Sequence, residues 1–94
     1  MIVTSPDDYR FLRFEVSERK GKKYDAILQN KETKKELRVP FGDRNYGQYE
    51  DKALGVYSRL DHGDEDRRAN YIRRHEKDIN NKFSSGWFSR RYLW

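Results

Sequence analysis

The chain has 94 residues, of which 34% are hydrophobic, 39% are charged and 15% are aromatic, and it contains no cysteine. A chain of this length forms one domain at most, and the lack of cysteine excludes a disulfide framework and zinc sites built on thiolates. The net charge of +5 favours an anionic partner: a nucleic acid, an acidic protein face or an anionic membrane surface. No apolar run approaches the ~20 residues that a membrane-spanning helix needs, so we expect no membrane span.

The first predicted strand lies within residues 9–19. Leu12, Phe14 and Val16 recur at every second position and share one apolar side, as a half-buried strand requires. A polar turn rich in lysine follows. We therefore expect residues 1–22 to supply an N-terminal strand or extension of a single domain that spans residues 1–94.

Two further strands are predicted at residues 24–29 and 37–41, because both segments alternate in the same way. The apolar positions are Tyr24, Ala26 and Leu28 in the second strand, and Leu37, Val39 and Phe41 in the third. Pro40 cannot donate a ladder hydrogen bond, which suggests a sheet edge or a strand end. Short polar turns separate the three segments, so the pattern predicts a three-stranded antiparallel sheet.

A helix is predicted from about residue 65 to 78, with Asp64 as its N-cap. Ala69, Ile72 and Ile79 form a narrow apolar stripe along it. Residues 83–94 are predicted to form a short last helix. The expected fold is therefore α+β, a small three-stranded antiparallel sheet followed by one or two helices, with the 65–78 helix and the aromatic tail covering the sheet.

The tail combines large apolar side chains with arginines. These residues are Trp87, Phe88, Arg90, Arg91, Tyr92, Leu93 and Trp94. Aromatic and arginine side chains are typical anchors of protein interfaces, and they can also stack on bases and pair with phosphates. A plainer alternative is that Trp87, Phe88 and Leu93 close the chain's own core. The candidate protein interface consists of Trp87, Phe88, Arg90, Arg91, Tyr92 and Trp94.

The predicted 65–78 helix carries a second candidate surface, a basic face. Its members are Arg67, Arg68, Arg73, Arg74 and Lys77. Such a face could contact phosphates and make binding strongly dependent on salt. The alternative is a solvated or protein-binding face, which we favour because nothing in the pattern indicates readout of bases.

Metal binding and catalysis are not expected. His62 and His75 lie thirteen residues apart and do not form the paired histidines of a metalloprotease helix; we expect His75 to pack beside Tyr71. No serine lies in a nucleophile-elbow context, and the glycines do not form a phosphate-cradling loop. We therefore expect no enzyme activity, no cofactor, no metal and no small-molecule substrate.

Several short motifs occur in a fixed order along the second part of the chain. They are Lys23-Tyr24, Arg38-Val39-Pro40-Phe41-Gly42, Tyr46, Tyr49, His62-Gly63-Asp64, Arg67-Arg68, Tyr71, Arg74-His75, Ser85-Gly86-Trp87-Phe88-Ser89-Arg90 and Leu93-Trp94. As an ordered set over residues 22–94 they resemble a family of small basic proteins encoded by large nucleocytoplasmic DNA viruses of eukaryotes. The resemblance implies a viral setting rather than an activity.

Together these features lead to an expectation about function. We expect a structural protein of the virion, a minor capsid or internal cement component that contacts other capsid proteins. The alternative is a basic viral protein that coats or condenses DNA, and a regulator that binds a host protein stays open as a third reading. The lack of cysteine favours an intracellular or virion location.

Overall fold

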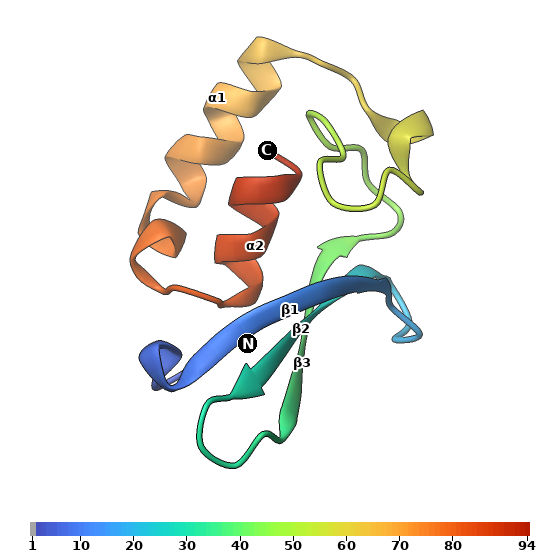
Figure 1. Cartoon of the computed structure of the whole chain (residues 1–94). Coiled ribbons are helices and arrows are strands. Elements are labelled where there is room, and N and C mark those ends of the chain that lie inside the picture. Colours follow the sequence, from blue (N-terminus) through green and yellow to red (C-terminus); the bar gives the residue numbers. More distant parts are fainter. Residues whose placement is uncertain (1) are drawn as a thin grey trace.

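Three consecutive strands form one antiparallel sheet in the order β1-β2-β3, followed by two helices, which confirms the expected α+β fold (Figure 1). The computed structural model describes residues 2–94. The elements are β1 (Tyr9–Val16), β2 (Lys22–Asn30), β3 (Glu36–Asp43), α1 (Glu65–Arg74) and α2 (Ser85–Tyr92), with short 3-10 turns at Pro6–Asp8, Ser58–Leu60 and Glu76–Asn80. No helix among residues 2–94 is both long enough and apolar enough to cross a membrane.

The alternation predicted for the second and third strands is confirmed. Tyr24, Ala26 and Leu28 of β2 are fully buried. Val39 and Phe41 of β3 are fully buried as well and lie opposite Ala26 and Tyr24. β2 is buried because β1 and β3 cover its two edges and the cluster with Phe88 and Leu93 covers its core-side face.

The regular alternation predicted for the first strand is interrupted at Leu12, which is half-buried. The pairing of β1 with β2 shifts between Phe11 and Arg13, so that Phe11 lies opposite Leu28 and Leu12 has no partner in the register. A bulge of this kind inserts one extra residue, and the side chains before and after it exchange faces. Phe11 consequently lies on the core side, 4.8 Å between ring centroids from Phe14.

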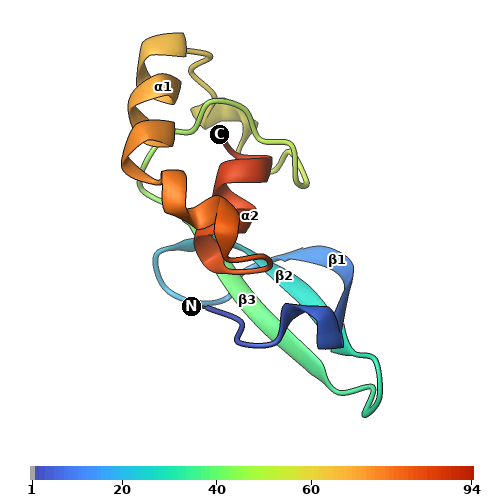
Figure 2. The same cartoon turned by 90° about the vertical axis from the view of Figure 1, so that its left-hand side faces the viewer.

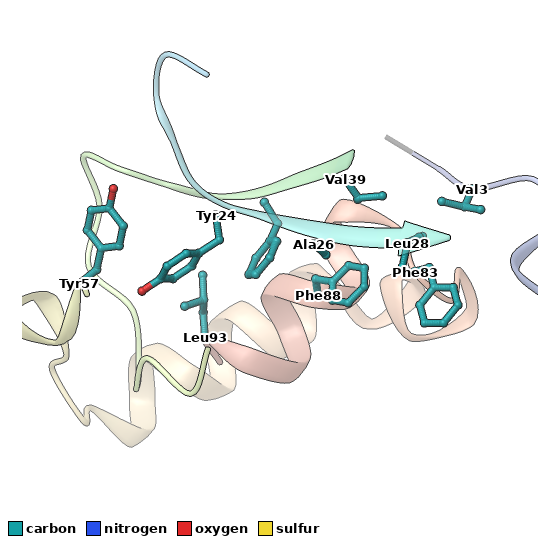
Figure 3. Packing of buried hydrophobic residues seen from close by; sticks show 10 residues of the cluster. Val3, Tyr24, Ala26, Leu28, Val39, Tyr57, Phe83, Phe88 and Leu93 are labelled. Carbon is teal, nitrogen blue, oxygen red and sulfur yellow. The ribbon is translucent and has the colours of Figure 1, made fainter. Parts of the chain in front are cut away.

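Helix α2 covers the sheet and forms most of the core with it (Figure 3). The ring of Phe88 stacks on Phe41 with centroids 5.5 Å apart. Leu93 is 1% exposed and packs over Gly42, where a Cβ atom would lie 2.9 Å from its Cδ1. Val3, near the start of the chain, is also buried in this cluster.

Helix α1 does not cover the sheet, contrary to the prediction. It lies beside α2 on the side away from the sheet, so that the sheet, α2 and α1 follow one another as layers (Figures 1 and 2). The helix ends at Arg74 instead of residue 78, it has no fully buried residue, and Ile79 of the predicted apolar stripe is 61% exposed. The apolar stripe of α1 is narrow, whereas α2 and the residue after it carry the large apolar side chains Phe88 and Leu93. The segment with more apolar area, α2, therefore packs on the apolar face of the sheet.

The connection between β3 and α1, residues 44–64, is held by buried side chains rather than by regular structure. The Tyr24 hydroxyl donates to the Asp51 carboxylate at 2.5 Å, and Asp51 also accepts the backbone N–H of Tyr57.

Lys23 is 1% exposed, and its ammonium donates to the Tyr46 carbonyl and the Gln48 side-chain oxygen. Burial lowers the pKa of Lys23, and the surrounding carboxylates, Asp51 foremost, partly oppose this.

Candidate functional site

The tail residues divide between the core and the surface. Phe88 is 1% exposed and contacts rings from β1, β3 and α2 itself. Its side chain therefore belongs to the chain's own core, together with Leu93, which confirms the core alternative for these two residues. Phe88 cannot reach a partner while this fold is intact, and the other five residues of the predicted interface remain as candidates.

Three of those five lie on the part of α2 around the buried Phe88. Tyr92 packs edge-on against Phe14, with ring centroids 4.7 Å apart. Arg91 is exposed, and its guanidinium lies 5.2 Å from the centroid of the Trp87 ring. Trp87 is half-buried. We define the aromatic surface as these residues and the β1 rings beside them: Phe11, Phe14, Trp87, Arg91 and Tyr92.

Buried Phe88 lies beneath this aromatic surface and supports it. The ring of Trp87 lies perpendicular to that of Phe88 with centroids 4.9 Å apart, and the centroid of the Phe11 ring lies 5.9 Å from that of Phe88. Phe11 remains 37% exposed. The sequence pattern did not bring Phe11 and Phe14 together with the tail, although two phenylalanines out of phase in one strand are a signal of a bulge.

Strand β1 borders the aromatic surface and is an edge of the sheet. The sheet order β1-β2-β3 gives β1 a single neighbour, so one row of its backbone N–H and C=O groups has no strand partner within residues 2–94. Open edges of this kind can pair with a strand of another chain. The aromatic surface thus adjoins backbone groups that are able to extend the sheet.

Trp94 lies at the other end of α2 and fastens α1. Its ring is parallel to that of Tyr71, with centroids 4.4 Å apart and planes within 4°, and its other neighbour is His62 at 5.2 Å. The Trp94 carbonyl accepts a hydrogen bond of 2.7 Å from Arg68. Tyr71 also stacks on His75 at 4.3 Å, which confirms the predicted contact of these two residues. Burial, with the nearby Asp78 carboxylate, raises the pKa of Tyr71 to about 12.

The predicted basic face is divided among three environments. Arg67 and Arg74 line a groove of about 710 Å³ between α1, α2 and the end of β3. Arg68 turns inward to Trp94 and to the ring of Tyr49, 5.0 Å from its guanidinium. Arg73 and Lys77 are exposed and do not line the groove. Arg90, from the tail, is half-buried on α2.

The outer face of the sheet carries cations that are already paired. Glu15 accepts hydrogen bonds of 2.8 Å from Arg13 and 2.7 Å from Arg38, and Arg38 also lies 3.5 Å from Asp25. Arg38, followed by Arg13, holds the pKa of Glu15 below its ordinary value. These arginines are therefore matched by carboxylates, which makes this face a poor candidate for binding an anion.

No protein-family model, no curated protein and no solved structure matches this chain.

Proposed function

We propose that this chain is a non-enzymatic structural protein of a virus particle, a minor capsid or internal cement component that binds a neighbouring protein through the aromatic surface. The observation that carries the proposal is that two rings pack against buried Phe88 and remain partly accessible: Phe11 of the edge strand β1, and Trp87 with Arg91 over its ring. The viral setting rests on the resemblance of the ordered motifs in residues 22–94.

The composition of the aromatic surface supports binding to protein. Tryptophan, tyrosine and arginine are the residues that most often dominate the energy of an interface, and Trp87, Tyr92 and Arg91 supply all three. Their rings already pack on the core from one side, so binding would order few additional side chains. The open edge of β1 would add backbone hydrogen bonds at the border of the contact.

Nucleic-acid coating by base stacking receives less support. Stacking needs a free aromatic face. The guanidinium of Arg91 lies over Trp87, and Trp94 stacks on Tyr71 with the tilted ring of His62 at 5.2 Å. Each tryptophan therefore already has an intramolecular neighbour on its ring, which leaves less free aromatic face for a base.

Quantitative mass spectrometry of purified virus particles tests the proposal. We expect a fixed copy number that stays with the shell when the particles are stripped with salt and detergent. Absence from the particles, or release of the chain together with the genome, would contradict a role in the shell.

A site-specific cross-link tests the surface itself. A photo-reactive amino acid in place of Trp87 is expected to cross-link to a shell protein within the particle. The same amino acid in place of Arg73, which is exposed on α1, is the matched control and is expected not to. Equal cross-linking from both positions would mean that the aromatic surface is not the contact.

A further inference from the structure

The groove between the two helices and the end of β3 is lined by several unpaired cations. Arg67 and Arg74 contribute from α1, and Lys22 contributes from the start of β2. Among residues 2–94, none of these three side chains forms an ion pair with a carboxylate. They differ in this respect from Arg13 and Arg38 on the outer face of the sheet, which are paired.

The two arginines point into the groove because of their spacing. Seven residues correspond to about two turns of an α-helix, so Arg67 and Arg74 lie on one side of α1 about 10 Å apart along its axis. Tyr71, between them, also lines the groove. Lys22 belongs to the opposite wall, since it comes from the sheet. A ligand in the groove would meet positive charge from two sides.

Neutral hydrogen-bonding groups accompany the cations. Asn70, Ser85 and Ser89 all line the groove. Hydroxyl and amide groups of this kind, together with arginine and lysine, make up most contacts to phosphate oxygens in nucleic-acid complexes. Arginine is also suited to phosphate because its planar guanidinium can donate two parallel hydrogen bonds.

Two carboxylates, Asp43 and Asp78, line the groove together with four cations, the three above and Lys23. Asp78 lies 3.2 Å from the His75 ring nitrogen, and its carboxylate occupies the space beside Gly86 at the start of α2. Asp43 accepts the backbone N–H of Asn45 at 2.9 Å. Both carboxylates keep their charge, but among residues 2–94 neither forms an ion pair with Arg67, Arg74 or Lys22, and the cations that line the groove outnumber them.

We propose that this groove binds phosphate groups of a nucleic-acid strand through Arg67, Arg74 and Lys22. The site is distinct from the aromatic surface. Ser85 and Ser89 lie on one side of α2, whereas Trp87 and Arg91 lie on roughly the opposite side, as the helical period requires. A protein with both surfaces would contact a neighbouring protein on one side of α2 and a nucleic acid on the other.

Salt-dependent binding of a short single-stranded DNA measures the number of phosphate contacts. In the full chain, Arg67→Gln with Arg74→Gln removes both groove arginines. The plot of log affinity against log salt has a negative slope, and the loss of two phosphate contacts should make it shallower by about 1.4. At about 50 mM salt, each lost contact should weaken binding roughly tenfold. Arg73→Gln with Lys77→Gln is the matched control, because it removes the same charge from exposed positions, and it should change the slope far less.

A second measurement needs no substitution. Gly42 and Gly47 line the groove, so their backbone NMR signals should shift when the DNA is added to the unaltered protein. Three outcomes would overturn the proposal: an equal loss of affinity in both double variants, binding of inorganic phosphate or a mononucleotide as strong as that of the strand, or equally tight binding of a polyglutamate peptide in the same groove. The last would assign the groove to an acidic protein.

Discussion

Gly42 shows how a single residue joins the sheet to the helix layer. Its φ of +78° lies in the left-handed region, which residues with a Cβ atom rarely adopt. A Cβ atom there would also lie 2.9 Å from the Leu93 side chain and 3.1 Å from that of Lys23. The close approach of β3 to the end of α2 therefore requires glycine, which adopts this φ without strain and has no side chain to clash with Leu93.

Gly42→Ala should lower the free energy of unfolding by about 2–4 kcal/mol, because backbone strain and overpacking add. Gly21→Ala is the matched control: its φ is +80°, but nothing lies within 4 Å of the position of a Cβ atom. The control should cost about 1–2 kcal/mol, from backbone strain alone. Urea unfolding of both variants checks this, and equal losses would show that the contact with Leu93 is unimportant.

We expect the hydroxyl of Tyr71 to make a pH-dependent contribution to stability. Because its pKa is raised to about 12, its contribution is fully present below about pH 10, the ordinary tyrosine value, and is lost as the pH rises towards 12. Tyr71→Phe keeps the ring stack and removes the titration. The difference between the two proteins in unfolding free energy should change by at most about 1.4 kcal/mol for each pH unit in this range. No change in that difference would mean that the hydroxyl is not buried.

At the scale of elements, α1 is the part most weakly held. It has no fully buried residue, and its main contacts are those of Arg68 and Tyr71 with Trp94 and of Glu65 with the Tyr49 hydroxyl. A helix of ten residues is marginal in isolation. Its ends therefore matter, and Asp64 caps the first turn by accepting the N–H groups of Asp66 and Arg67, as predicted from the sequence.

Asp64→Ala should lower the free energy of unfolding by about 1 kcal/mol, the usual cost of removing an N-cap. Asp64→Asn should be nearly neutral, because the amide oxygen can accept the same hydrogen bonds. Thermal unfolding followed by circular dichroism measures both. A loss as large for asparagine as for alanine would assign the effect to the charge of Asp64 rather than to its hydrogen bonds.

At the scale of the whole molecule, the layers differ in what holds them. The sheet and α2 share the buried core, whereas α1 is fastened mainly by Trp94, which stacks on Tyr71 and accepts a hydrogen bond from Arg68. Regions with few buried apolar contacts open locally before the whole structure unfolds. We therefore expect α1 to be able to separate from a sheet–α2 unit that stays folded.

Trp94→Ala should speed amide hydrogen exchange in α1 and leave the exchange of β2 nearly unchanged. Tyr46→Ala is the control, since Tyr46 is 69% exposed and its loss should alter neither element. Exchange followed residue by residue by NMR distinguishes these cases. Equal acceleration in α1 and β2 would mean that the three layers unfold as one unit.

Local sequence patterns were sufficient to predict those features of the structure that depend on residues close together in the chain. The alternation of Tyr24, Ala26 and Leu28 predicted a buried strand face, because every second residue of a strand points to the same face. Asp64 predicted the start of α1, since an N-cap acts within one turn. The aromatic tail predicted a core element, and Phe88 and Leu93 are its buried residues.

Only the tertiary structure decided how these pieces compete for the same surface. The bulge at Leu12 changes the phase of β1 and brings Phe11 to the core side of the sheet, next to α2. α2 takes the single apolar face of the sheet, which leaves α1 outside it. The predicted basic face then divides, with Arg67 and Arg74 in the groove and Arg68 turned inward. Sequence periodicity determines which side of an element is apolar. Which helix covers the apolar side of the sheet depends on how much apolar area each helix can bury there, and this depends on the packing of the whole chain.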